Sequence, residues 1–134
     1  MKNFEYVNGA VGPLKSGMTR EEVRAALGMH GEFRKTVFSE NTTDNFPSSA
    51  AHVFYDLSDI IKGVEIFNAA SFVVLGSDIL CMKASEAIAF FNANQLKVEL
   101  MDSGFNVEKI NASFYVPDML EDELAKILSV YIDL

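Results

Sequence analysis

Hydrophobic and polar positions first fall into a helical pattern in residues 17–28, GMTREEVRAALG. Val23 and Leu27 are four residues apart and therefore share one face of a helix. Thr19 and Glu22 have the spacing of a capping box, in which each side chain binds a backbone N–H at the helix start. The closing glycine can adopt the left-handed conformation that ends many helices. The pattern predicts one complete helix in this segment.

The next segments alternate between apolar and polar residues with the two-residue period of a strand. We expect strands over residues 33–39, 52–55, 60–67 and 71–75. The polar stretch 40–49, ENTTDNFPSS, separates the first two strands and should be an exposed loop. The last three strands are joined by turns too short for a crossover, so they should form an antiparallel meander.

The C-terminal part continues with three segments: a helix over residues 85–94, an ambiguous stretch over 95–104 that fits either a strand or a helix, and a strand over 109–116. A short helix should begin at Asp118, a favoured N-cap residue, and end near residue 125. Residues 126–134 fit a helical stripe, but Val130, Tyr131 and Ile132 are strong β-formers. We favour a closing strand there over a longer helix.

These elements predict an α+β fold, in which an antiparallel sheet of about five to six strands packs against two to three helices in a single layer on one face. A length of 134 residues fits a single domain over 1–134. The eleven phenylalanines indicate an aromatic-rich core. We see no internal repeat in the residue pattern.

The formal net charge is −8, and it is concentrated toward the C-terminus. Residues 1–50 carry six basic and six acidic side chains, whereas residues 101–134 carry two basic and seven acidic ones. This sign disfavours nucleic acids and anionic membranes and favours a basic protein partner. It also simply keeps a small protein soluble. The N-terminal residues lack the apolar run of a signal peptide, so we expect a cytoplasmic protein.

The sequence contains few residues and motifs suited to catalysis or to metal binding. Glycine-rich phosphate loops, nucleophile elbows and zinc-binding helix motifs are missing from the sequence. The histidines are His30 and His52, and the sole cysteine is Cys81, which we expect to be buried. A disulfide within the chain is therefore impossible, and a cysteine–histidine nucleophile pair would need a fold that joins distant residues. We predict neither an enzyme nor a cofactor or metal site.

The best candidates for partner binding are acidic. One group, Asp118, Glu121, Asp122 and Glu123, lies at the predicted C-terminal helix start. It forms either a docking patch for a basic protein or a solvated helix N-terminus. A second group follows the predicted loop and hairpin: Glu40, Asp44, Asp56 and Asp59. Phe46 in the same loop is either an aromatic anchor for a partner or packed back onto the core. Asp56 and Asp59 also suit a turn.

Two resemblances add to this interpretation. The segment GMTREEVRAALG resembles the helix opening of SmpA/OmlA-type outer-membrane lipoproteins and other small bacterial α+β domains. That resemblance implies an envelope-assembly role, which would need a longer precursor with a lipidated cysteine. The segments HVFYDLSDIIKGVEIF, SFVVLGSDILCM and FYVPD resemble the small acidic immunity proteins encoded beside bacterial polymorphic toxins.

The second resemblance implies a cytoplasmic protein that binds one cognate toxin, often a basic nuclease, and blocks it. We therefore predict an immunity-type protein that occludes a basic toxin domain. The alternative is a small enzyme or ligand-binding domain with a pocket between sheet and helices.

Overall fold

The computed structural model describes residues 2–122 and 124–134. These residues form two α-helices, α1 (Arg20–Leu27) and α2 (Ala84–Ala93), and two short 3-10 helices, η1 (Pro47–Ser49) and η2 (Glu108–Ile110). An eight-stranded sheet has the order β3-β4-β5-β6-β12-β11-β10-β9. A four-stranded sheet has the order β2-β1-β7-β8. The α+β class is thus confirmed.

The first half of the chain supplies β1 (Asn3–Val7), β2 (Ala10–Val11), β3 (Gly31–Phe33), β4 (Thr43–Phe46), β5 (Ala51–Tyr55) and β6 (Ile61–Phe67). The second half supplies β7 (Ser71–Val74), β8 (Ser77–Asp78), β9 (Glu99–Met101), β10 (Gly104–Val107), β11 (Ala112–Tyr115) and β12 (Ser129–Asp133). The predicted single sheet of five to six strands is wrong. Several strands have only two to four residues, too few for a period to be recognised.

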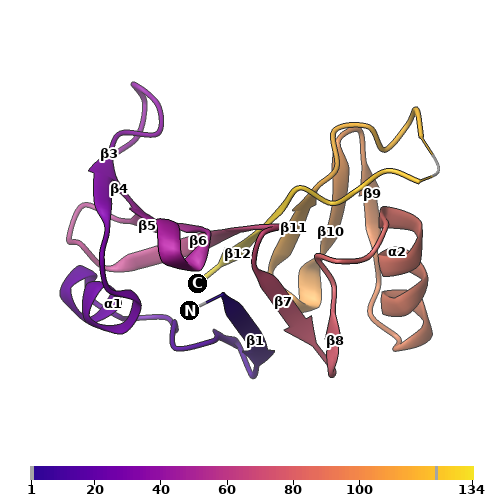
Figure 1. Ribbon diagram of the computed structural model, residues 1–134, viewed down its shortest axis with the longest axis horizontal. Coiled ribbons are helices and arrows are strands. Elements are labelled where there is room, and N and C mark those ends of the chain that lie inside the picture. The colour runs from indigo at the N-terminus through magenta and orange to yellow at the C-terminus, as the bar shows by residue number, and fades with distance from the viewer. Residues whose placement is uncertain (1, 123) are drawn as a thin grey trace.

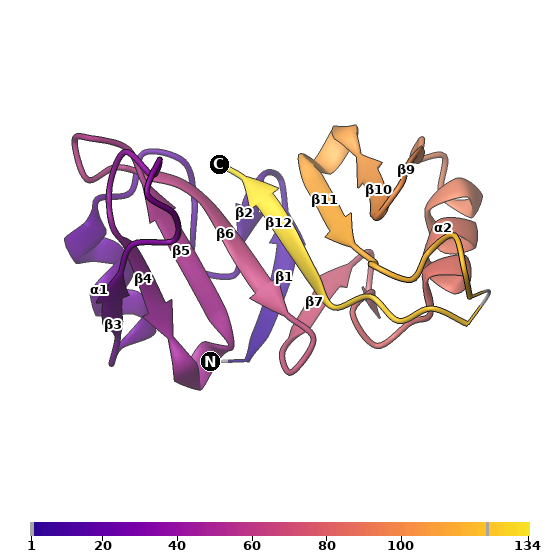
Figure 2. The ribbon, with the colours of Figure 1, turned by 90° about the horizontal axis from the view of Figure 1, so that it is seen from above.

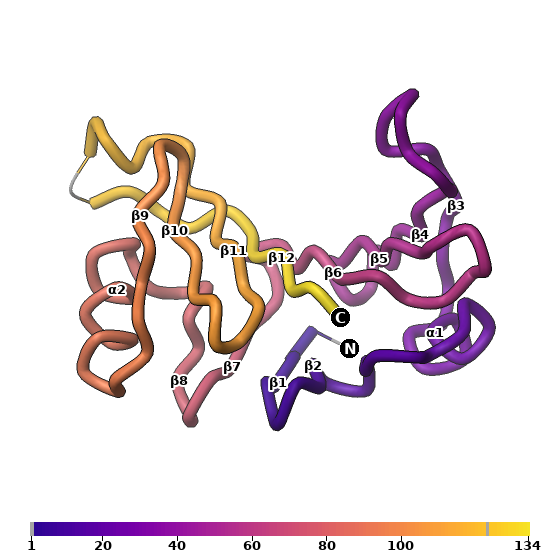
Figure 3. The backbone as a smooth tube through the Cα atoms, turned by 180° about the vertical axis from the view of Figure 1, so that it is seen from behind, coloured from indigo at the N-terminus to yellow at the C-terminus, as the bar shows by residue number. Residues whose placement is uncertain are grey.

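The larger sheet has one covered face and one open face. Figure 1 shows α1 and the strands β1, β7 and β8 below this sheet, while the loops after β3 and β11 rise above it. Figure 2 views the sheet from above, and Figure 3 shows from behind how β1 and β7 approach each other. Within the described residues, the helices and the smaller sheet therefore share one side of the larger sheet.

Phenylalanine rings fill the core below the second half of the sheet. Phe105 and Phe114 stack with their centroids 4.7 Å apart. Phe91 of α2 contacts Phe114 at 5.6 Å, and Phe72 of β7 contacts it at 6.1 Å. All four are essentially buried. The aromatic-rich core expected from composition is present, and α2 and β7 meet the sheet through it.

The predicted N-terminal helix is confirmed with its capping box. The Glu22 backbone N–H donates to Thr19 Oγ1 at 3.2 Å, and the Thr19 backbone N–H donates to Glu22 Oε1 at 3.0 Å. Val23 and Leu27 are buried. Gly28 ends the helix with φ at 85°, the region that glycine adopts most easily. The helix over 85–94, the hairpin with its turn at 57–59, and the closing strand are also present.

Three predictions about these elements are wrong. The antiparallel meander stops after the β5–β6 hairpin, because β7 pairs in parallel with β1 in the smaller sheet. Residues 34–39 do not extend β3, because Thr36 and Ser39 close a local turn: the Thr36 backbone N–H donates to Ser39 Oγ at 3.1 Å. The helix predicted from Asp118 is absent from the described residues, which form successive turns instead. One helix-like hydrogen bond, from Asp122 N–H to Asp118 O at 3.0 Å, is present within these turns.

The order of elements in residues 3–67 recurs in residues 71–133. The matching elements are β1 with β7, β2 with β8, α1 with α2, β3 with β9, β4 with β10, η1 with η2, β5 with β11, and β6 with β12. Conformations match as well. Asn8 and Gly9 have φ of 49° and 87° in the first turn, and Leu75 and Gly76 have 50° and 82° in the second.

A second pair of equivalent sites fixes the register of the repeat. Ala50 follows η1 with φ at 50°, and Asn111 follows η2 with φ at 52°. Phe67 N–H donates to Ala50 O at 2.9 Å, and Asp133 N–H donates to Asn111 O at 3.0 Å. The chain is therefore a structural tandem repeat, contrary to our expectation from the residue pattern. Equivalent positions share backbone geometry more than residue type.

The strands β6 and β12 join the halves about a pseudo-two-fold axis. Their register gives these central pairs: Val64 with Ile132, Glu65 with Tyr131, and Ile66 with Val130. Val64 is equivalent to Val130 and Ile66 to Ile132. A rotation that exchanges the two halves therefore converts the Val64–Ile132 pair into the Ile66–Val130 pair. The axis therefore passes between Glu65 and Tyr131.

Candidate protein-binding face

We call the side of the eight-stranded sheet opposite the covered core the open face. Alternation along the strands places these half-buried or exposed side chains on it: Phe33, His52, Phe54, Glu65, Phe67, Ser113, Tyr115 and Tyr131. The face thus carries large aromatic side chains where a solvated sheet usually carries polar ones. Aromatic side chains that remain accessible to water are typical of recognition surfaces.

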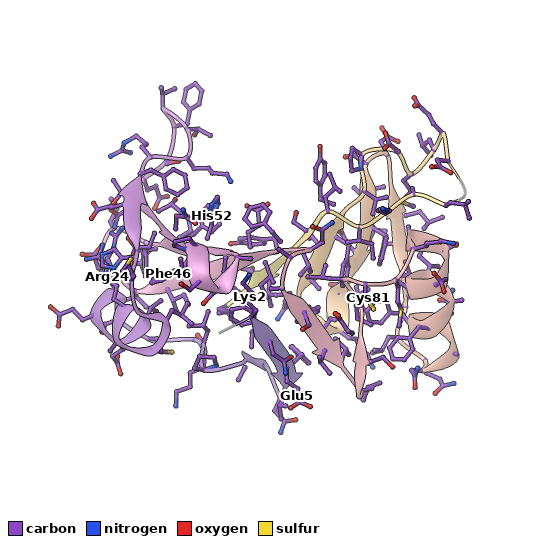
Figure 4. All side chains as sticks on the ribbon, in the orientation of Figure 1. Lys2, Glu5, Arg24, Phe46, His52 and Cys81 are labelled. Atoms are coloured by element: carbon purple, nitrogen blue, oxygen red, sulfur yellow. The ribbon has the colours of Figure 1, made fainter. Side chains whose placement is uncertain are left out.

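Aromatic contacts order the first half of the open face. His52 lies between Phe33 and Phe67, with ring centroids 5.0 Å and 4.8 Å away in edge-to-face geometry. Phe54 contacts Tyr131 across the two halves at 5.7 Å. Figure 4 shows His52 on the upper side of the sheet, between the two rising loops. These rings form a preorganised platform with little rotamer freedom left to lose on binding.

One lysine lies against this platform. Lys35 Nζ is 3.1 Å from Glu65 Oε1, 3.3 Å from His52 Nδ1 and 5.9 Å from the centre of the Phe54 ring. Burial, followed by the nearby Lys35 charge, lowers the pKa of His52 below its usual value. The imidazole is therefore neutral at pH 7, and Nδ1 accepts a hydrogen bond from Lys35.

Both loops that border the open face expose large apolar side chains. In the loop between β3 and β4, Val37 is 85% exposed and Phe38 is 92% exposed. In the segment between β11 and β12, Leu120 is 75% exposed and Leu124 is 60% exposed. Figure 1 shows both segments rising on the same side of the sheet. Apolar groups at such projecting positions are a mark of an interaction site.

The structure places two predicted binding residues in the interior. Phe46 and Asp44 both have no exposed surface, so the expected exposed loop around them is wrong. Asp44 accepts hydrogen bonds from Arg24 Nε at 2.8 Å, Arg20 Nη2 at 3.1 Å and the Tyr55 hydroxyl at 3.0 Å. Burial raises the pKa of Asp44, but these donors outweigh it and hold the pKa at about 2. Asp44 therefore anchors α1 to the sheet.

The hairpin acids stabilise their own turn. Asp56 Oδ1 accepts from the backbone N–H groups of Ser58 at 2.8 Å and Ile60 at 3.0 Å. Asp59 accepts from Asn41 Nδ2 at 2.7 Å and forms an ion pair with Arg20 at 3.0 Å. Hydrogen bonds from Asn41 and Arg20 lower the pKa of Asp59. Both acids already have structural partners, as turn aspartates commonly do.

The C-terminal acids lie on the surface. Asp118, Glu121 and Asp122 are exposed in the segment that borders the open face, beside the exposed Leu120. Glu123 lies outside the described residues. Glu40 is exposed in the opposite loop. The predicted acidic patch is therefore divided, with its largest group on the rim of the second half.

The structure does not bring the candidate nucleophile and base together. Figure 4 shows His52 and Cys81 in opposite halves of the molecule. Cys81 is exposed rather than buried as predicted, and its thiol donates to Asp78 O at 3.2 Å. Partial burial and then the Asp78 charge raise the pKa of Cys81, so it is a thiol at neutral pH. Among the described residues, no cluster of three His, Cys, Asp or Glu side chains is arranged for a metal.

Comparison with known proteins yields no relative. No family model matches the chain, and neither the curated proteins nor the solved structures give a match. Within residues 2–122 and 124–134, none of the helices has both the length and the apolarity to cross a bilayer. The functional argument therefore rests on the open face itself.

Sequence reasoning missed the residues that organise this face, notably Lys35, Glu65, Tyr115 and Tyr131. A signal was available in the strands. Phe54, Tyr115 and Tyr131 occupy positions that alternate with buried residues, where polar side chains are the rule. Aromatic residues at polar positions of a strand indicate a face used for binding.

Proposed function

We propose that this protein is a non-enzymatic binding protein of the immunity type, which covers a basic bacterial toxin domain with its open face. The observation that carries the proposal is the pair of exposed apolar rims, Val37 with Phe38 and Leu120 with Leu124, on either side of an aromatic floor. Such a combination of apolar anchors around a concave or open surface favours a protein partner.

The dimensions of the face suit a folded partner. Eight neighbouring strands at about 4.8 Å spacing give a sheet roughly 34 Å wide. A stable interface needs about 800 Å² from each partner, which a face of this width can supply. The hollow lined by Glu65, Ser113 and Tyr131 is open to solvent rather than enclosed, which suits a protein surface better than a small substrate.

Charge favours a basic partner. The chain carries a net charge of −8, and the exposed Asp118, Glu121 and Asp122 lie on one rim of the open face. An acidic rim accelerates encounter with a cationic protein, and the acceleration falls as salt screens it. Occlusion follows if the partner uses its basic surface to hold an acidic substrate. The alternative of a small enzyme gains no support from His52 and Cys81, which lie in separate halves.

The test is binding to the C-terminal toxin domain encoded next to this protein's gene, measured by calorimetry and by inhibition of the toxin. We expect Phe38→Asp to weaken the complex about tenfold or more, as for an interface anchor. The matched control is Leu75→Asp, because Leu75 is 65% exposed in the β7–β8 turn, which Figure 1 shows pointing away from the open face. Equal effects of both variants, or no complex at micromolar concentration, would reject the proposal for that pair.

A further inference from the structure

The second half of the open face contains a hollow of about 320 Å³. The residues that line it include Glu65, Asn106, Ser113, Tyr115, Ser129 and Tyr131. We call this the Glu65 hollow. It lies beside the pseudo-two-fold axis, because Glu65 and Tyr131 form the cross-strand pair at that axis.

The repeat shows what occupies the equivalent place in the first half. The residues that follow Ala50 and Asn111 are equivalent, so His52 corresponds to Ser113 and Phe54 to Tyr115. In the first half, the space above these strands holds the imidazole of His52 and the side chain of Lys35. In the second half, a serine replaces the imidazole, and this exchange leaves the hollow.

Lys35 shows how the first half holds a cation. Its ammonium group lies 3.1 Å from Glu65 Oε1 and 5.9 Å from the centre of the Phe54 ring. A carboxylate and an aromatic face together are a favourable site for a basic side chain. The lysine comes from the long loop between β3 and β4, and its side chain contacts Glu65 and His52 of the sheet.

The second half has a related set of groups without a lysine. Tyr115 stands where Phe54 stands in the first half, and Tyr131 stands where Glu65 stands, so the carboxylate that borders the hollow is Glu65 itself, from across the axis. The other oxygen, Oε2, accepts from Ser129 Oγ at 3.3 Å, and Ser129 lines the hollow. The connection between β9 and β10 is only the turn Asp102–Ser103, which cannot supply a lysine.

We propose that the Glu65 hollow accepts a lysine or arginine side chain of the partner protein, as Lys35 fills the equivalent place in the first half. The inference rests on the proposed function, because the basic side chain belongs to the bound partner. The cation lies between the Tyr115 and Tyr131 rings and shares the Glu65 carboxylate with Lys35. The surplus of five acidic side chains in residues 101–134, seven against two, favours such an occupant.

The test uses the full chain and a probe of defined chemistry. Acetyl-arginine methylamide is titrated into the ¹⁵N-labelled protein, with acetyl-norleucine methylamide as the uncharged analogue of similar length. We expect saturable shifts of the amide signals of Ser113, Tyr115 and Tyr131 at millimolar concentrations for the arginine probe alone. Glu65→Gln should weaken binding about fivefold, the loss of one charged partner at a half-exposed site. Glu5→Gln, on the far side in Figure 4, should not.

A second variant separates recognition from folding. Lys35→Met frees Glu65 Oε1 from its internal cation, so it should tighten probe binding. Tyr115→Leu should weaken it, with thermal unfolding reported for both. Shifts of equal size for norleucine, or shifts unchanged in Glu65→Gln, would overturn the assignment. If the probe binds as expected but no toxin complex forms, the proposed function is rejected and the assignment of the hollow stands. If a toxin complex forms and is unaffected by Glu65→Gln, only the hollow fails.

Discussion

Glu65 and Tyr131 lie opposite each other in the antiparallel pair β6–β12, at the point where the two halves of the molecule meet. They are equivalent positions of the repeat, yet one is a carboxylate and the other a phenol. The face around them is therefore nearly symmetric in backbone and asymmetric in chemistry. The first half presents a filled aromatic platform, whereas the second presents an acidic rim and a hollow.

The close packing at this axis depends on Gly63, which has no side chain beneath the Tyr131 ring. A Cβ atom there would lie 2.2 Å from the Tyr131 hydroxyl and 2.7 Å from the backbone oxygen of Ile132. We expect Gly63→Ala to lower the free energy of unfolding by about 2 kcal/mol, as overpacking does. Urea unfolding measures this change. Gly31→Ala is the control, because a Cβ at Gly31 meets nothing within 4 Å; equal losses would contradict the argument.

The buried ion cluster around Asp44 should dominate the acid sensitivity of the fold. The pKa of the Asp44 carboxyl is held at about 2, below the usual 3.8. The contribution of this carboxylate to stability is therefore complete above pH 4 and is lost as pH falls toward 2. Asp44→Asn removes the buried carboxylate that Arg20 and Arg24 share, and leaves them only their exposed partners Asp59 and Glu32. We expect a loss of about 3 kcal/mol at pH 7, as for a broken buried ion pair.

The pH profile provides the discriminating measurement for this cluster. The free energy of unfolding of the natural protein should fall between pH 4 and pH 2, and the fall should be smaller in Asp44→Asn. Asp118→Asn is the control, because Asp118 is an exposed carboxylate outside the cluster. A profile in Asp44→Asn as steep as that of the natural protein would show that other carboxylates govern acid unfolding.

The capping box of α1 gives a prediction about local stability. Thr19→Ala removes the acceptor for the Glu22 backbone N–H, which is 3.2 Å from Thr19 Oγ1. Loss of an N-cap typically costs about 1 kcal/mol. Amide hydrogen exchange should accelerate in α1 first, since the cap acts on the first turn. Ser16→Ala, at an exposed position before the helix, serves as the control; equal exchange in both variants would contradict the cap's role.

The sequence was sufficient for elements whose signals are local. The capped helix α1, the hairpin around Asp59 and the closing strand at Ser129–Asp133 each depend on neighbouring residues. The burial of Asp44 could not be predicted this way. A polar residue in a polar stretch becomes interior only because Arg20 and Arg24 arrive from a helix earlier in the chain.

The tandem repeat was hidden for a related reason. The two turns before the helices share left-handed backbone angles, but one is Asn8-Gly9 and the other Leu75-Gly76. Leucine is rare in that conformation, so its presence there gives no signal. The candidate face was missed because strand pairing over long sequence distances decides which aromatic residues meet. Phe54 and Tyr131 contact only once β6 and β12 are paired.

The exposed Phe38, in the loop that borders the open face, allows binding to be separated from stability. Its side chain is 92% exposed, so it contributes little to folding, and Phe38→Ser should change the free energy of unfolding by no more than about 0.5 kcal/mol. Phe105→Ser, at a fully buried position, should cost about 4 kcal/mol or prevent folding. Urea unfolding compares the two. Retention on a hydrophobic column should fall for Phe38→Ser, because an accessible ring is removed from the rim. If Phe38→Ser instead destabilises the fold by several kcal/mol, its loop packs against the sheet in solution, and the first-half rim is not available to a partner.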